Sequence, residues 1–166
     1  MSLVTPRMDR LFAIAQRILR DIHQAEDALQ DAVVAAWRDI RGLRDADRFD
    51  AWLRRLLVNV CIAAASRERR RASNLREMPL EGPAAPDDIL PIAVQDQLER
   101  AFRRVSPEQR ALLVLQHFEG YAPWEIADAL GIPASTARSR LQHAHQAMRA
   151  ALEADARTIS AGGVPR

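Results

Sequence analysis

The stretch "PWEIADALGIPASTARSRLQHAHQAMR" (residues 123–149) predicts two helices joined by a tight turn. Pro123 suits the first turn of a helix, because its missing N–H has no partner there. Gly131 suits the left-handed residue that ends a helix. A helix, a short glycine-containing turn and a second helix are the parts of a helix-turn-helix motif.

The second of these helices separates into an apolar side and a polar side. Ala137, Leu141, Ala144 and Met148 recur at helical spacing and are expected to face a core. Arginine, glutamine and hydroxyl side chains suit the base edges and phosphates of DNA, so the polar side predicts a recognition helix. A solvated amphipathic helix with its charges outward is the alternative. The DNA-contacting candidates are Ser135, Thr136, Arg138, Ser139, Arg140, Gln142 and His143.

Two further helices are predicted just before the motif. Leu98, Phe102 and Val105 line the first, and "SPEQ" (residues 106–109) is a strong start signal for the second. Ser106 can cap that helix while the Gln109 side chain reaches back to it. Its expected inward residues are Leu112, Leu115 and Phe118, and Gly120 ends it.

The N-terminal part of the chain shows three apolar stripes with the helical period. They fall within residues 11–22, 25–40 and 52–60. The residues of the second stripe, all expected inward, are Ala25, Ala28, Leu29, Ala32, Val33, Ala36, Trp37 and Ile40. Trp52 is expected mainly in the core. No alternating run of β-branched residues competes with these stripes, so the chain is predicted to be all-α.

Residues 76–95 divide the chain into two modules. They hold four of the nine prolines and one Arg against four acidic residues, which is a net charge of −3. Proline fixes φ and removes a donor, so we expect an acidic flexible linker. The predicted organisation is an N-terminal module (residues 1–75), this linker, a C-terminal module (residues 96–152) and a disordered tail (residues 153–166).

Composition limits the class of protein. The 166 residues carry a net charge of +2, and the 24 Lys and Arg residues are all Arg, whose planar fork suits phosphate and base edges. The one cysteine, Cys61, allows no internal disulfide, and no apolar run approaches the roughly 20 residues that span a bilayer. We expect a soluble cytoplasmic protein. The four histidines form no metal-binding pattern, and no phosphate loop or nucleophile elbow appears, so neither catalysis nor a cofactor is expected.

Three segments in order resemble a known family. They are "AEDALQDAVVAAW" (25–37), "FDAWLRRLLVNVC" (49–61) and "YAPWEIADALGIPASTARSRL" (121–141). Together they resemble regions 2 and 4 of the extracytoplasmic-function sigma factors, small members of the bacterial sigma-70 family. The resemblance covers about residues 8–72 and 96–152. It implies that the N-terminal module is region 2 and the C-terminal module is region 4.

The resemblance also implies partners and residue roles. Region 2 would bind core RNA polymerase and would recognise and melt the −10 promoter element, while region 4 would recognise the −35 element through the recognition helix. An anti-sigma factor is a further expected partner, and the free protein is expected to be a monomer. The implied polymerase-binding residues are Asp27, Gln30 and Asp31, and the implied −10 residues are Arg54, Arg55, Asn59, Arg67, Arg69, Arg70 and Arg71.

Two other functions fit the same residues. One is a dimeric helix-turn-helix regulator that binds duplex DNA without melting it. The other is a sigma-like interaction module that binds polymerase or a regulator but starts no transcripts. The sequence also departs from the family pattern at Ala122, a poor N-cap, and at "QHAHQ" (142–146), where histidines replace a more basic stretch. DNA binding would then depend on the charge of His143 and His145.

Overall fold

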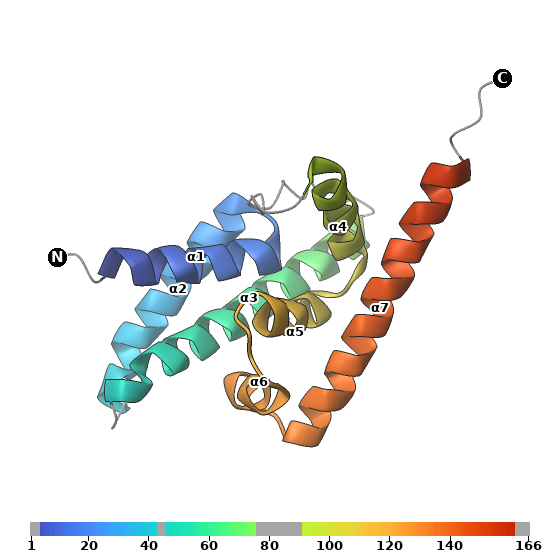
Figure 1. Ribbon diagram of the computed structural model, residues 1–166. Coiled ribbons are helices and arrows are strands. Elements are labelled where there is room, and N and C mark those ends of the chain that lie inside the picture. Colours follow the sequence, from blue (N-terminus) through green and yellow to red (C-terminus); the bar gives the residue numbers. More distant parts are fainter. Residues whose placement is uncertain (1–3, 43–45, 76–90, 162–166) are drawn as a thin grey trace.

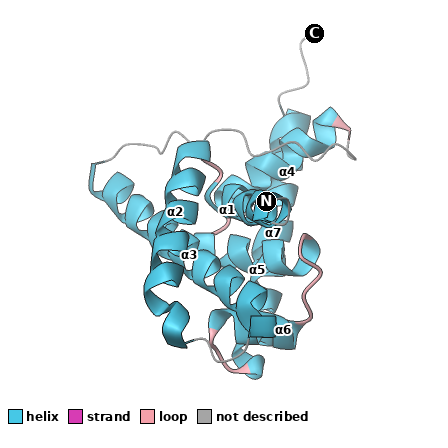
Figure 2. Ribbon diagram, turned by 90° about the vertical axis from the view of Figure 1, so that its left-hand side faces the viewer, coloured by secondary structure: helices cyan, strands magenta, loops and turns pink. Residues whose placement is uncertain are grey.

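The computed structural model describes residues 4–42, 46–75 and 91–161, and every regular element in those ranges is a helix (Figures 1 and 2). The all-α prediction is therefore confirmed. Within the described ranges, none of the helices is both long and apolar enough to cross a membrane. The α-helices are α1 (Val4–Leu19), α2 (Ile22–Asp39), α3 (Phe49–Leu75), α4 (Ile92–Arg104), α5 (Pro107–His117), α6 (Pro123–Leu130) and α7 (Ala134–Ala161), and two 3-10 turns, Ile40–Gly42 and Ala46–Arg48, lie between α2 and α3.

Helices α1, α2 and α3 pack together as the predicted N-terminal bundle. A sharp corner joins α1 to α2: Arg20 has φ of 60°, and the Asp21 Oδ1 accepts the Gln24 backbone N–H at 2.8 Å. This N-cap satisfies one of the free donors at the start of α2. The buried side chains of the bundle are Leu11, Ile14, Ala15, Ile18 and Leu19 of α1, Ala25, Ala28, Ala32 and Ala36 of α2, and Leu53, Leu57, Val58 and Cys61 of α3.

The expected inward stripe of α2 is confirmed for its alanines but wrong for three of its larger residues. Val33 and Ile40 are exposed, and Trp37 is 82% exposed. Four alanines of the expected stripe, Ala25, Ala28, Ala32 and Ala36, form its buried part, because their small side chains let the helix approach α1 and α3 closely. Val33 and Trp37 each follow a buried alanine by one residue, which places them about 100° further around the helix. Trp52, in contrast, packs against the core as expected.

The predicted start and stop signals of the C-terminal module are confirmed. The Gln109 N–H donates to Ser106 Oγ at 3.2 Å, and the Ser106 N–H donates to Gln109 Oε1 at 3.0 Å, which completes a capping box. Gly131 has φ of 65° and ends α6 in the left-handed region. Phe118, expected inward, is instead exposed, because it lies past the last residue of α5 and stacks under the Arg17 guanidinium, 3.6 Å from the ring centroid.

The linker and the tail both prove shorter than predicted. Helix α4 begins at Ile92, so residues 92–95 are helical, while residues 76–90 lie outside the described ranges. Helix α7 continues to Ala161, so a disordered tail is wrong for residues 153–161, and residues 162–166 are not described. Asp155 explains the continuation, because its buried carboxylate accepts from Arg100 Nε of α4 at 2.9 Å.

The two modules pack against each other. Helices α1 and α3 contact α5, and α3 also contacts α6, so the helix-turn-helix lies against the N-terminal bundle (Figure 1). A buried arginine, Arg110 of α5, donates from Nη1 to the backbone oxygen of Ile18 at 2.9 Å. This bond satisfies a carbonyl at the end of α1 that has no partner within its own helix.

Burial of Cys61 predicts an unreactive thiol. Desolvation raises the pKa of Cys61 to about 12, so the thiolate that reacts with disulfide reagents is scarce at neutral pH. We expect no release of thionitrobenzoate from the native protein at pH 8, and one equivalent after unfolding in guanidinium. Rapid reaction of the native protein would contradict the packing of α3 described above.

Candidate nucleic-acid and polymerase interface

The helix predicted to recognise DNA is the first half of α7. Ala137, Leu141, Ala144 and Met148 are buried, as their spacing predicted. The polar residues named for DNA contact lie on the other side: Thr136 is partly buried, and Ser135, Arg138, Ser139, Arg140, Gln142 and His143 are exposed. The arrangement leaves the polar side accessible while the apolar side holds the helix against the rest of the C-terminal module.

Helix α6 supports the recognition helix and begins with a partial cap. The Ala122 side chain cannot accept a hydrogen bond, but its backbone N–H donates to Glu125 Oε2 at 2.8 Å. One half of a capping box therefore survives the poor N-cap that the sequence showed. Next to it, Trp124 is 65% exposed. The sequence analysis did not single out Trp124, although Ile126 and Ala127 mark the inward side of α6 and Trp124 lies off that side.

Helix α3 carries most of the implied −10 residues on one exposed stripe. Arg55, Asn59, Arg67 and Arg70 recur at spacings that place them on the same side, and all four are exposed. Arg69 and Arg71 are exposed as well. Because α3 runs on to Leu75, this arginine run lies within the helix and not at its end. The structure thus places four cationic or amide side chains on one side of α3, with Arg69 and Arg71 flanking them.

Arg54 lies apart from that stripe and faces the C-terminal module. Its side chain is 19% exposed, its Nε is 3.4 Å from Glu119 Oε2, and its guanidinium lies 5.4 Å from the Tyr121 ring centroid. Arg55 also reaches the other module, because its guanidinium occupies the place that a side chain on Gly131 would fill. Gly131 is therefore required both by its positive φ and by this close approach.

The implied polymerase-binding residues are exposed on α2. Asp27, Gln30 and Asp31 share one side of the helix, and the same side continues through Val34 and Trp37, both exposed. Sequence reasoning found the acidic half of this surface but placed Trp37 in the core. The stripe expected inward held both the buried alanines and Trp37, so it was too wide for one face of a helix.

A charged interface joins the two modules. Glu119, which follows α5, has a side chain only 1% exposed, and its carboxylate lies 3.1 Å from Arg10 Nε and 3.4 Å from Arg54 Nε. The Arg20 guanidinium, which is also buried, forms an ion pair with Glu99 of α4. Because one member of each pair is shielded from water, their attraction is stronger than that of a fully exposed pair.

Ser66 of α3 donates from Oγ to Glu108 Oε1 of α5 at 2.9 Å. Partial burial opposes ionisation of Glu108, but hydrogen bonds from its own backbone, Ser66 and Ser106, with the nearby Arg69 charge, outweigh it. They hold the pKa of the Glu108 carboxyl below its usual value. The interface therefore includes an ionised carboxylate that receives donors from both modules.

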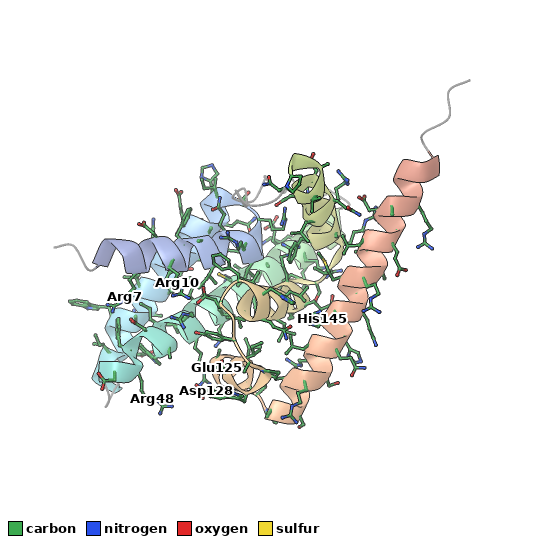
Figure 3. All side chains as sticks on the ribbon, in the orientation of Figure 1. Arg7, Arg10, Arg48, Glu125, Asp128 and His145 are labelled. Atoms are coloured by element: carbon green, nitrogen blue, oxygen red, sulfur yellow. The ribbon has the colours of Figure 1, made fainter. Side chains whose placement is uncertain are left out.

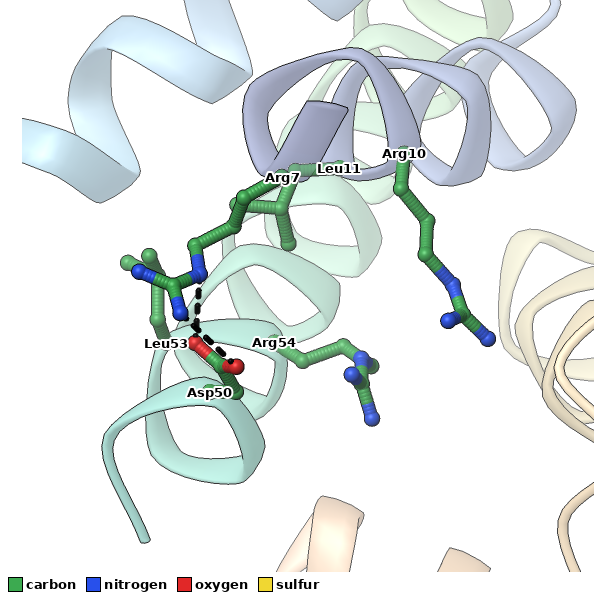
Figure 4. Close-up of a pocket in the computed structure, with 6 residues that line it drawn as sticks. All are labelled: Arg7, Arg10, Leu11, Asp50, Leu53 and Arg54. Atoms are coloured by element: carbon green, nitrogen blue, oxygen red, sulfur yellow. Dashed lines mark hydrogen bonds and ion pairs between the residues drawn. The ribbon is translucent and has the colours of Figure 1, made fainter. Parts of the chain in front are cut away.

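A small cavity lies beside the Glu119 contacts. Its volume is about 220 Å³, and its lining residues are Arg7, Arg10, Leu11, Asp50, Leu53 and Arg54 (Figure 4). Arg7 Nε lies 2.7 Å from Asp50 Oδ1, while the Arg10 and Arg54 guanidinium groups reach toward the C-terminal module. Among the described residues, no group of three or more His, Cys, Asp or Glu side chains could hold a metal ion.

A histidine pair links α5 to α7. The rings of His117 and His145 meet edge to face with centroids 5.2 Å apart, and His145 Nε2 lies 2.7 Å from Gln116 Oε1. Figure 3 labels His145 on α7. Partial burial and the nearby charge of His145 lower the pKa of His117, because both disfavour its protonated form.

Comparison with known proteins matches both modules to one family. The family description "Sigma-70 region 2" matches residues 3–71, and "Sigma-70, region 4" matches residues 95–148. The RNA polymerase sigma-E factors of Streptomyces avermitilis and Streptomyces coelicolor are 34% and 32% identical over 164 residues, which is 94% of this chain and 88% and 89% of theirs. The sigma factor RpoE of Bartonella quintana, solved with the anti-sigma factor NepR, has the same fold, with a TM-score of 0.68 and 23% sequence identity. The match covers 90% of this chain and 94% of the Bartonella chain.

The N-terminal bundle contains a basic helix, and the C-terminal module contains a helix-turn-helix with an exposed polar face. This combination is typical of DNA-binding transcription factors. The matches make the assignment specific: the chain belongs to the extracytoplasmic-function sigma factors of the sigma-70 family. Members of this family direct the initiation of transcription, and so does this chain.

The histidine pair predicts that acid destabilises the protein. The pKa of His117 is lowered in the folded state, so the unfolded chain binds the proton more readily. Its contribution to stability is complete above the unfolded pKa of about 6.5 and is lost as the pH falls below it. We expect urea midpoints at pH 7.5, 6.5 and 5.5 to fall less steeply for His117→Gln than for the native protein. His23→Gln, which changes an exposed histidine of α2, is the control and should keep the native slope.

Proposed function

We propose that this sigma factor binds core RNA polymerase, recognises the −35 element with α7 and recognises and melts the −10 element with α3. The observation that carries the proposal is the pair of exposed polar helix faces described above, one in each module. The core polymerase supplies the phosphodiester chemistry, and this chain supplies recognition and strand opening. We infer that it has no catalytic activity of its own and that it acts in the cytoplasm.

Region 4 would place the start of α7 in the major groove. The first residues of a recognition helix contact base edges, and the N-terminus of the helix attracts phosphate. Arg138 and Arg140 suit guanine, whose O6 and N7 accept two hydrogen bonds from one guanidinium. Ser135 and Ser139 are short enough to donate to the DNA backbone where the helix enters the groove.

Region 2 would hold the opened strand along α3. Extracting a base from the stack costs a few kcal/mol, so a protein that binds the extracted base shifts the equilibrium toward the open duplex. Asn59 is the candidate for a base edge, because its amide both donates and accepts. The arginines of the same stripe, from Arg55 to Arg70, would neutralise the strand backbone.

The α2 surface would bind the polymerase. Asp27, Gln30 and Asp31 supply charge and hydrogen bonds, and Trp37 adds a large apolar side chain to the same side. Interfaces commonly combine an aromatic anchor with surrounding polar groups, and the aromatic residue then carries much of the binding free energy. We add Trp37 to the docking residues that the family resemblance implies.

An anti-sigma factor is the other proposed partner. The Bartonella sigma factor of the same fold was solved with the anti-sigma factor NepR. We propose that this chain is regulated by a protein of the same class, and that the free chain is a monomer. A dimeric regulator would instead bind palindromic duplex DNA without polymerase, and an interaction module would bind polymerase without starting transcripts.

Promoter selection tests the proposal. With purified core RNA polymerase and a genomic fragment library, we expect run-off transcripts that depend on this chain. Arg138→Ala should lower selection at the −35 position that it contacts by about 1–3 kcal/mol. Asn59→Ala should reduce opening of the −10 region, measured by permanganate reactivity of unpaired thymines. Arg157→Ala removes an exposed arginine of α7 away from the proposed recognition residues and should leave initiation unchanged. No transcripts with the native chain would contradict the proposal.

Polymerase binding tests the role of Trp37. Because this side chain is 82% exposed, Trp37→Ala should change the free energy of unfolding little. It should weaken binding to core polymerase by about 2 kcal/mol if Trp37 is an interface anchor. Trp124→Ala, which truncates the exposed tryptophan of α6, is the matched control for a general loss of apolar surface. Equal affinities for the native protein and Trp37→Ala would exclude this residue from the interface.

A further inference from the structure

Three arginines of the N-terminal module share one opening. Arg7 and Arg10 come from α1 and Arg54 comes from α3, and they line the 220 Å³ cavity shown in Figure 4. Leu11 and Leu53 supply its apolar lining. Guanidinium groups from two helices thus converge on a space large enough for a phosphate group.

The acidic groups at this opening are fewer than the arginines. Asp50 pairs with Arg7, with 2.7 Å between Oδ1 and Nε. The single carboxylate of Glu119 is divided between Arg10 and Arg54. Three cations therefore meet two carboxylates, and the 3.4 Å separation from Arg54 is longer than a good hydrogen bond. The site retains positive charge and unused donors.

Glu119 belongs to the other module. It follows α5, its side chain is 1% exposed, and its carboxylate lies against Arg10 of α1 and Arg54 of α3. A phosphodiester resembles a carboxylate in charge and accepts hydrogen bonds on two free oxygens, which suits arginine forks. Withdrawal of the C-terminal module would remove Glu119 and leave Arg10 and Arg54 ready for such a group.

We propose that the Arg7–Arg10–Arg54 pocket binds a backbone phosphate of single-stranded DNA, and that Glu119 occupies this phosphate position while the two modules are packed together. The inference rests on the proposed function of α3. Arg54 lies in the second turn of α3, about 100° around the helix from Arg55, the first residue of the exposed stripe. A strand on this stripe would have to turn toward α1 at the N-terminal end of α3 to reach the pocket.

Strand binding and module packing then compete for the same two arginines. A ligand that binds only the separated form shifts the protein toward that form, by the difference in its affinity for the two forms. Loss of the Glu119 charge should act in the same direction without any ligand. The free protein would consequently bind single strands weakly, because part of its phosphate site is filled from within.

The test uses the full chain and a fluorescein-labelled dT12 oligonucleotide. Fluorescence anisotropy measures its binding, and the uniform sequence limits the measurement to contacts that do not depend on base identity. We expect Glu119→Gln, which keeps the shape of the side chain, to bind about fivefold more tightly than the native protein at low salt. The plot of log affinity against log salt should steepen by about 0.7 for each additional phosphate that the protein neutralises. Asp50→Asn, a change of an exposed acid, should also tighten binding by releasing Arg7.

Two controls keep the outcomes distinct. Glu153→Gln makes the same change at an exposed site on α7 and should leave affinity and salt slope as in the native protein. Adding Arg10→Ala to Glu119→Gln should reverse the increase in affinity. Unchanged binding by both Glu119→Gln and Asp50→Asn, or an increase that Arg10→Ala does not reverse, would overturn the proposal. Run-off transcription by the native chain reports separately on the proposed function, so the two failures are distinguishable.

Discussion

Helix α5 is buried on almost every side, and the arrangement of both modules depends on it. Its residues Ala111 to Leu115 are all buried, which requires neighbours around the whole helix. Helices α1 and α3 cover one part of it and α6 and α7 another, as Figure 1 shows. Because the core is shared, the position of the recognition helix relative to α3 is set by packing as well as by the chain that connects the modules.

Charged residues form hydrogen bonds and ion pairs between the two modules at this junction. Arg110 donates to the last turn of α1, Arg20 pairs with Glu99, and Glu119 is held between two arginines of the N-terminal module. Buried charges are costly unless they are paired, so each of these contacts favours the packed arrangement over one in which only one partner stays buried.

Function in this family needs surfaces that remain free of the protein's own core. The polar face of α7, the basic stripe of α3 and the acidic and aromatic face of α2 are exposed while their opposite faces are buried. An amphipathic helix achieves both with one sequence, because residues three and four apart share a side. The short side chains of α2 and the glycine at position 131 allow close approach where the helices meet.

Local sequence determined the helices, their caps and the polar face of α7, since these depend on neighbours a few residues apart. The Ser106 capping box, the left-handed Gly131 and the buried series from Ala137 to Met148 all followed from spacing alone. Tertiary structure decided which members of the apolar stripe of α2 are buried: the close approach of α1 and α3 covers the alanines and leaves Val33, Trp37 and Ile40 exposed. It also decided that Arg54 faces Glu119, that Asp155 holds the end of α7 in place, and that three arginines share one pocket. Those contacts join residues far apart in the chain, and no local pattern encodes which distant side chain will become a neighbour.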